Sequence, residues 1–174
     1  MDTLLPADQA LARHALTASA NAYAQYSGFA VGAAARMRNG AIHLGANLEN
    51  ASYGVAMCAE VSAITAANTS GSLDLEAIAV VGHRFTPPIV ADQVVTPCGR
   101  CRQLIFEASQ ISGVDIRVIS CSADLEQIDV SPISILLPSA FGPRAIGLDQ
   151  DWIGMRATLA ERVRVLQAQL VQKD

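Results

Sequence analysis

Three cysteines and one glutamate in this sequence have the types and the spacing of a catalytic metal site. Cys98 and Cys101 lie three residues apart in Pro-Cys-Gly-Arg-Cys, so both thiolates can bind one metal ion. Cys58 lies upstream and is followed by Glu60 in Cys-Ala-Glu. Three protein ligands, an open coordination position and a nearby carboxylate describe a zinc ion that activates water. We therefore predict Zn²⁺ as cofactor, held by the three cysteines.

Glu60 is not needed as a ligand, so it can carry protons to and from the bound water. Two alternatives make the zinc structural. In one, Glu60 only caps a helix of a non-catalytic zinc scaffold. In the other, Cys121 completes a four-sulfur site, although its apolar strand pattern is typical of a core thiol. The histidines fall in no ligand pattern: His14, His43 and His83.

Both halves of the predicted site lie at predicted helix starts, near residues 57 and 98. Free backbone N–H groups and the positive end of the helix dipole stabilise thiolates there. Inside a regular helix, residues two apart point about 200° from each other. Cys58 must therefore still lie in the preceding loop if its side chain and that of Glu60 are to face the same metal centre.

The remaining elements alternate between helices and strands. Asn39-Gly40 is a strong hairpin signal between the first two strands, and a proline-containing loop over residues 83–96 leads to Cys98. Such an order predicts an α/β sandwich with a mixed sheet of about five strands. We predict helices over residues 6–26, 57–68 and 98–109, and strands over residues 31–38, 41–48, 76–82, 115–121 and 133–137.

The C-terminal segment has apolar residues at every third or fourth position, which predicts an amphipathic helix. We divide the chain into a zinc-dependent domain over residues 1–143 and a helical extension over residues 144–174. Because acids and bases mix on its polar face, we expect the extension to pack on its own domain or on a sister subunit, not on a membrane. The apolar positions are Trp152, Met155, Leu159, Val163, Leu166 and Leu170.

Composition excludes several classes of partner. The 174 residues have no apolar run near the about 20 residues that span a membrane, and the N-terminal segment is acidic where a signal peptide is basic. We expect a cytoplasmic protein. With 12 basic and 16 acidic residues the net charge is −4, and aromatics are 5%. Nucleic-acid binding and editing of polynucleotides are thus disfavoured, and a small neutral substrate is expected.

Four motifs taken together resemble the short, zinc-dependent, usually tetrameric cytidine deaminases. They are Asn-Leu-Glu-Asn-Ala-Ser-Tyr-Gly at residues 47–54, Cys-Ala-Glu at 58–60, Pro-Cys-Gly-Arg-Cys-Arg-Gln at 97–103 and Leu-Pro-Ser-Ala-Phe-Gly-Pro at 137–143. The resemblance covers about residues 10–143. It implies a three-layer α-β-α sandwich, a role in pyrimidine nucleoside salvage and a homotetramer whose active sites are shared between subunits.

The resemblance also implies a reaction, the hydrolytic deamination of cytidine and deoxycytidine to uridine and deoxyuridine with release of ammonia. Zinc-bound hydroxide would attack the ring carbon that bears the amino group. Glu60 would protonate the adjacent ring nitrogen and then the departing amine.

The family's substrate-binding residues can be placed on this sequence by the same resemblance. Asn47 and Glu49 would hold the sugar hydroxyls, because a carboxylate accepts strongly and an amide both donates and accepts. Phe29 would pack on the base, and neighbouring subunits would lend Tyr53 and Phe141, with ordinary core packing as the alternative for these aromatics. The predicted set is Phe29, Asn47, Glu49, Tyr53, Ala59 and Phe141.

One position departs from the family pattern. Most members have an arginine directly after the glutamate, where it offsets thiolate charge, and this chain has Val61. We predict that Arg100 and Arg102 lie near the metal and offset that charge; the alternative is that both are solvated. Val61 with Arg100 also resembles the blasticidin S deaminases, so a cytosine-nucleoside analogue is an alternative substrate, although the motif at residues 47–54 argues against it.

Overall fold

The computed structural model describes residues 4–87, 92–148 and 151–171. The chain forms two compact units, one ending at Gly142 and one beginning at Pro143. Strands of the first unit are β1 (Phe29–Met37), β2 (Ile42–Ala46), β3 (Leu75–Arg84), β4 (Arg117–Cys121) and β5 (Ile128–Pro132). Its helices are α1 (Pro6–Ser19), α2 (Ala59–Thr69), α3 (Gly99–Ser112) and the single turn α4 (Ile133–Leu136), with a 3-10 turn η1 at Tyr53–Val55.

The five strands form one mixed sheet in the order β2-β1-β3-β4-β5. β3 and β4 pair in parallel, and the other neighbours are antiparallel. The β1–β2 hairpin closes at the predicted Asn39-Gly40 turn, where the Met37 amide donates to the Ala41 carbonyl at 2.8 Å. The predicted mixed sheet is confirmed.

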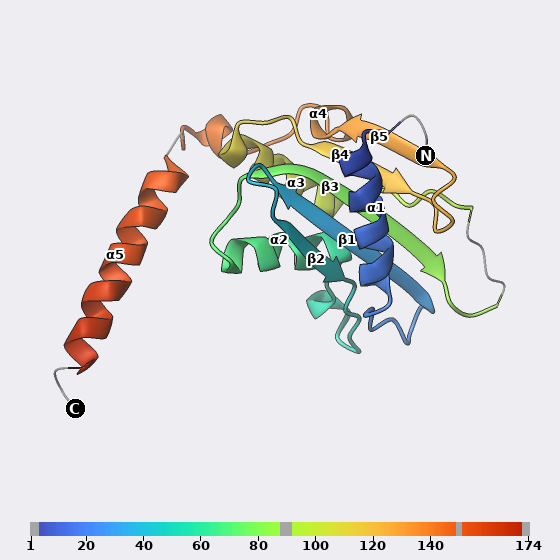
Figure 1. The fold of residues 1–174 in the computed structure, drawn as a ribbon, viewed down its shortest axis with the longest axis horizontal. Helices are drawn as coiled ribbons and strands as arrows, with labels where there is room; N and C mark the ends of the chain where they lie inside the picture. The colour runs from blue at the N-terminus through green and yellow to red at the C-terminus, as the bar shows by residue number, and fades with distance from the viewer. Residues whose placement is uncertain (1–3, 88–91, 149–150, 172–174) are drawn as a thin grey trace. The chain divides into compact units, whose positions relative to one another are not determined.

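Helices cover both faces of the sheet, as Figure 1 shows, with α1 on one face and α2 and α3 on the other. Alternation along the strands explains the two cores, because successive side chains point to opposite faces. Ala34 packs in the core beneath α1, whereas Ala33 and Ala35 pack in the core beneath α2 and α3. The predicted three-layer α-β-α sandwich is confirmed.

Glycine at position 45 of β2 brings α2 close to the sheet. A Cβ atom at Gly45 would collide with the Ala59 carbonyl and the Ala63 amide, which belong to the first turns of α2. Only a residue without a side chain permits this approach. The start of α2, next to Cys58, is thereby held against the sheet backbone.

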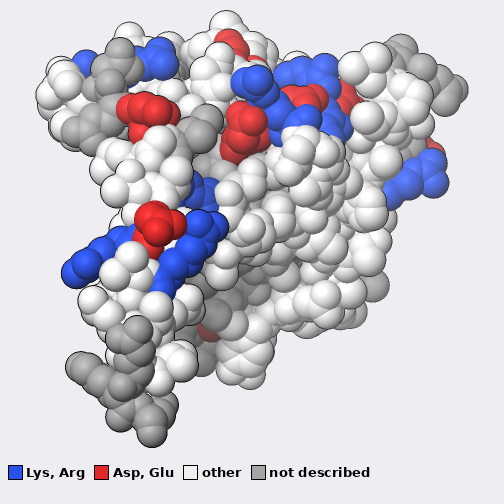
Figure 2. Space-filling view, turned by 60° about the vertical axis from the view of Figure 1, so that its left-hand side comes forward, with Lys and Arg blue, Asp and Glu red and all other residues white. Residues whose placement is uncertain are grey.

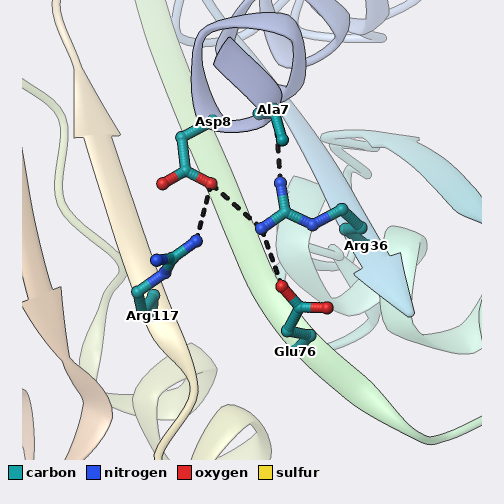
Figure 3. Close-up of polar contacts among 5 residues, drawn as sticks. All are labelled: Ala7, Asp8, Arg36, Glu76 and Arg117. Carbon is teal, nitrogen blue, oxygen red and sulfur yellow. Dashed lines mark hydrogen bonds and ion pairs between the residues drawn. The ribbon is translucent and has the colours of Figure 1, made fainter. Parts of the chain in front are cut away.

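A buried ion cluster fixes α1 to three strands (Figure 3). One carboxylate oxygen of Asp8, Oδ1, accepts hydrogen bonds from Arg36 Nη2 at 3.0 Å and Arg117 Nη2 at 2.9 Å. Arg36 also donates to the Ala7 carbonyl and pairs with Glu76, both at 3.0 Å. Asp8 and Arg36 are almost completely buried, and each has two partners of opposite charge that compensate its own charge.

The helix predicted over residues 6–26 is too long, because α1 ends at Ser19. Beyond it the backbone turns to bond with the segment after β2. The Tyr23 amide donates to the Asn47 carbonyl at 3.0 Å, and the Glu49 amide donates to the Tyr23 carbonyl at 2.8 Å. This tertiary pairing replaces the last helical turns that the composition suggests.

The strand predicted over residues 133–137 is wrong. The fifth strand is β5, and the apolar run after it forms the helical turn α4. Pro132 precedes this turn, and the Asp115 carboxylate accepts both the Ser134 amide at 3.1 Å and the Ser134 hydroxyl at 2.7 Å. A short apolar run does not distinguish a strand from a helical turn, and the bonds between Ser134 and Asp115 stabilise the turn.

The second unit contains a 3-10 turn η2 (Pro143–Ile146) and the helix α5 (Trp152–Val171). Asp151 precedes α5, and its Oδ1 accepts the Gly154 amide at 3.0 Å. The predicted C-terminal helix is confirmed, while its packing partner stays a prediction. Among the described residues, no helix is both long and apolar enough to cross a bilayer.

Candidate metal centre

The three predicted cysteine ligands lie at the starts of two helices. Cys58 immediately precedes α2 and Cys98 immediately precedes α3, and both have extended backbone conformations. Cys101 follows in the first turn of α3 and is fully buried. Cys58 therefore still belongs to the incoming loop, as the spacing to Glu60 requires.

The sulfur geometry fits a tetrahedral zinc ion. Cys98 Sγ lies 3.8 Å from Cys58 Sγ and 3.5 Å from Cys101 Sγ. The three sulfurs lie within 4.8 Å of one another. Zn–S bonds of about 2.3 Å in tetrahedral geometry place two sulfurs about 3.8 Å apart. The three thiolates can therefore hold Zn²⁺ and leave its fourth position open.

Cys121 is not part of this cluster. It packs with Leu11 and Ile119 in the core beneath α1, on the other face of the sheet from α2 and α3. Burial raises the pKa of its thiol to about 12. The four-sulfur alternative has no support, and among the described residues no histidine joins the cluster either.

Hydrogen bonding among the thiols separates their pKa values. The bond with Cys101 lowers the pKa of Cys58 to about 6, assisted by Cys98 and by the charge of Arg100. The same bond, together with burial, raises the pKa of Cys101. Of these two thiols, Cys58 therefore ionises more readily than Cys101, and metal binding requires deprotonated sulfur.

Glu60 lies in the first turn of α2 and is only 4% exposed. It lines the same cavity as Cys58 and Cys98. Burial raises the pKa of its carboxyl group, against the opposing effects of its own backbone amide and the Cys101 thiol. A buried carboxyl group with a raised pKa holds a proton more readily than a solvated one, which suits a group that accepts and releases protons in catalysis.

The cavity beside the cluster has a volume of about 280 Å³. Val31, Val95 and Thr96 also line it, and the sequence analysis missed them. Val95 and Thr96 directly precede the Pro-Cys-Gly-Arg-Cys motif, so their place in the sequence could have suggested them. Val31 lies in β1, far from any motif. Predicted residues on its wall are Asn47, Glu49, Cys58, Ala59, Glu60 and Cys98.

Asn47 joins the cavity wall to β1. Its Oδ1 accepts the Val31 amide at 2.8 Å, and its Nδ2 donates to the Phe29 carbonyl at 3.1 Å. These bonds extend the pairing of β1 beyond the end of β2. The amide keeps a second N–H and a second acceptor position for a ligand.

Glu49 holds the turn that follows α1. Its Oε2 accepts the Tyr26 amide at 2.9 Å and the Ser27 amide at 3.2 Å. Hydrogen bonding from the Ser27 side chain and from both amides lowers the pKa of Glu49. A lowered pKa favours the ionised carboxylate, which is a strong acceptor for hydroxyl groups.

None of the predicted aromatic residues lines the cavity beside the cysteines. Phe29 is half-buried, and its ring contacts the position of Gly82. Tyr53 is 82% exposed and lines an adjoining hollow of about 350 Å³ together with Glu49. Phe141 is 64% exposed. Within one chain, these three side chains do not close the site.

The two predicted arginines bind backbone carbonyls near the cysteines. Arg100 Nη1 donates to the Ala56 carbonyl at 3.2 Å, on the loop that leads to Cys58. Arg102 donates through Nε to the Pro97 carbonyl at 2.8 Å and through Nη1 to the Leu136 carbonyl at 3.1 Å. The charge of Arg100 also helps to lower the pKa of Cys58, and the role of Arg100 and Arg102 in offsetting thiolate charge stays a prediction.

Comparisons with known proteins agree with this geometry. A family model of the cytidine and deoxycytidylate deaminase zinc-binding region matches residues 5–116. A cytidine deaminase of Halalkalibacterium halodurans is 42% identical over 135 residues, which cover 76% of this chain and 92% of the relative. The crystal structure of cytidine deaminase from Burkholderia pseudomallei matches with a TM-score of 0.65 at 37% identity, covering 76% of this chain and 98% of that one. The Mycobacterium tuberculosis enzyme matches with a TM-score of 0.61 at 34% identity, covering 77% and 96%.

Proposed function

Because this chain belongs to the cytidine and deoxycytidylate deaminase family, we propose that it hydrolyses cytidine and deoxycytidine to uridine and deoxyuridine with release of ammonia. One observation carries the proposal. Cys58, Cys98 and Cys101 place their sulfurs at zinc-binding distances, and a buried carboxyl group lines the same cavity.

Glu60 moves the protons in this mechanism. Zinc, when bound by the three thiolates, supplies Lewis-acid activation of the water that attacks the amino-bearing ring carbon. Glu60 accepts a proton from that water and gives it to the adjacent ring nitrogen. Glu60 then accepts the remaining proton of the hydroxyl group that has added to the ring carbon and transfers it to the amino nitrogen. The C–N bond breaks, and the C–O bond becomes the carbonyl of the uracil ring as ammonia leaves.

Charge in the site favours a nucleoside over its 5′-phosphate. Among the described residues that line the cavity and the adjoining hollow, apart from the zinc-binding cysteines, the ionisable side chains of Asp, Glu, Lys, Arg and His are those of Glu49 and Glu60, and no basic side chain is among them. A phosphate binds beside Arg, Lys or several free N–H groups, and it is repelled by carboxylates. The ionised Glu49 instead accepts hydrogen bonds from sugar hydroxyls, with Asn47 beside it.

The face drawn in Figure 2 gives no support to polynucleotide editing. On the described part of the face in Figure 2, Lys and Arg side chains stand among Asp and Glu side chains and form no continuous basic track. Binding of a nucleic-acid strand needs such a track with stacking aromatics.

Exposed aromatics support a shared active site in a homotetramer. Tyr53 and Phe141 expose most of their surface in one chain, and contact with a second copy would bury them. Size-exclusion chromatography with light scattering tests this assembly, and a monomer with full activity would contradict it.

The extension over residues 144–174 adds to a deaminase unit that is complete without it. The match with the Burkholderia pseudomallei enzyme supports this proposal. It covers 98% of that enzyme but only 76% of this chain. Deleting residues 148–174 should leave zinc content and turnover nearly unchanged. Loss of both would place the extension within the catalytic unit.

The proposed activity is tested by a substrate screen followed by ultraviolet absorbance and ammonia release. We expect turnover of cytidine and deoxycytidine, and little or none of deoxycytidylate, free cytosine, adenosine or blasticidin S. Turnover of single-stranded DNA, or blasticidin S as the best substrate, would overturn the proposal.

A further inference from the structure

The first turn of α3 carries two polar residues directly after Cys101 that bind backbone carbonyls of other segments. Arg102 contacts the loop before Cys98 and the end of α4. Gln103 Nε2 donates to the Phe141 carbonyl at 2.8 Å. The ligand-bearing helix is thus joined to the segment over residues 136–142 by two adjacent side chains.

Arg102 uses its guanidinium as a bridge between backbone groups. Nε donates to the carbonyl of Pro97, a fully buried residue that precedes the ligand Cys98. Nη1 donates to Leu136, the last residue of α4. Carbonyls at the end of a helix lack partners within the helix, so this bond satisfies one of them. A weaker contact at 3.5 Å joins Nη2 to Thr96 Oγ1.

The segment that Gln103 holds lies closely against α3. A Cβ atom at Gly142 would lie 2.7 Å from Gln110 Oε1 and 2.8 Å from Phe106 Cε1, so glycine allows this approach. The carbonyl of the preceding Phe141 is fixed by Gln103. The backbone at Phe141 and Gly142 is therefore held against α3.

We infer that Arg102 is a positioning residue that ties the Cys98 loop to residues 136–142, and that it acts through its fork of donors and not through its charge. The inference deepens the proposed function and rests on it for the role of the zinc. It differs from the charge-offsetting role predicted from the sequence, because its donors bind the carbonyls of Pro97 and Leu136 and the hydroxyl of Thr96. Lysine has the same charge as arginine, but its charge and donors are concentrated on one ammonium group, which cannot span these three acceptors.

The test compares Arg102→Lys and Arg102→Ala with the wild-type zinc-loaded chain. We expect both variants to release zinc to a coloured chelator about tenfold faster or more, because outer contacts of this kind change metal affinity by about 10–100-fold. Amide hydrogen exchange of peptides over residues 133–142 should also become faster. Arg38→Lys is the matched control, because Arg38 also donates to a backbone carbonyl, that of Ser112, away from the cysteines.

Gln103→Glu gives a second variant, in which an acceptor of the same shape replaces the donor to Phe141. We expect faster exchange over residues 137–142 with a smaller change in zinc release. Wild-type zinc release and exchange in Arg102→Lys would overturn the inference, because charge alone would then suffice. Both measurements are made without substrate, so a chain that fails to deaminate cytidine would remove the proposed function and leave this result interpretable.

Discussion

Cys58 and Cys98 are 40 residues apart in the sequence, yet their Sγ atoms lie 3.8 Å apart. Each cysteine immediately precedes a helix. The helix after Cys58 is held against the sheet at Gly45, and the loop before Cys98 is held to β4 by the Val95 amide, which donates to the Cys121 carbonyl at 3.3 Å. The sheet thus sets the distance between the two sulfurs, so that the folded chain presents a formed site to zinc.

The zinc content of variants with a single cysteine replaced should distinguish the zinc ligands from the core thiol Cys121. We expect Cys98→Ser to lose most of its zinc, because two sulfurs remain for an ion that needs three. Cys121→Ser should keep its zinc, because Cys121 packs beneath α1 and outside the cluster. Elemental analysis of the purified variants measures both, and zinc loss in Cys121→Ser would restore the four-sulfur site.

Glu60→Gln should separate catalysis from metal binding. Glutamine keeps the shape of the side chain but cannot carry a proton, so we expect turnover of cytidine to fall by about 10²–10⁴-fold. Zinc content should stay at the wild-type level, since Glu60 is not among the three ligands. Initial rates at saturating cytidine give the first quantity. An unchanged rate would mean that Glu60 only caps α2.

The position of the cluster could be predicted from the sequence because the chemistry constrains the local backbone. Cys58 and Glu60, two residues apart, can share a target only at a helix start, and the structure has α2 beginning at Ala59. The apolar run at residues 133–137 had no such constraint. Its conformation depends on the Asp115 carboxylate, 19 residues away from Ser134.

The hydrogen-bond partners of the site's side chains could not be predicted from the sequence, because they lie on helices and strands that are distant in the chain. Asn47 was assigned to a sugar hydroxyl, and the structure adds that it binds the backbone of β1 at Val31. Arg102 was assigned to charge compensation on its proximity alone. Its direction toward Leu136 follows from the placement of α4, a turn that the sequence analysis predicted as a strand.

Gly45→Ala should weaken the fold at the metal site. The added methyl group would collide with the Ala59 carbonyl and the Ala63 amide, so the start of α2 must shift. We expect a loss of about 1–3 kcal/mol of unfolding free energy, the usual cost of overpacking. Zinc should also bind more weakly, because Cys58 moves with α2. Urea denaturation and a chelator competition measure the two effects.

Gly54→Ala is the matched control for Gly45→Ala. Its added Cβ atom has nothing within 4 Å, and stability should stay close to that of the wild type. Equal stability of the two variants would show that α2 does not depend on the close approach at Gly45.

Asp8→Asn should destabilise the first unit through the buried ion cluster. Asp8 and Arg36 are 2% and 8% exposed, so neutralising the carboxylate leaves a buried guanidinium with less compensation. Removing one partner of a buried pair typically costs about 3–5 kcal/mol. The Glu76 carboxylate, also 3.0 Å from Arg36, offsets part of this, so we expect about 3 kcal/mol in urea denaturation. Glu161→Gln is the control, because the Glu161–Arg164 pair is exposed and such pairs contribute about 0–1 kcal/mol. If both variants lose the same small amount, Glu76 alone is enough to hold Arg36, and α1 is fixed by its apolar face.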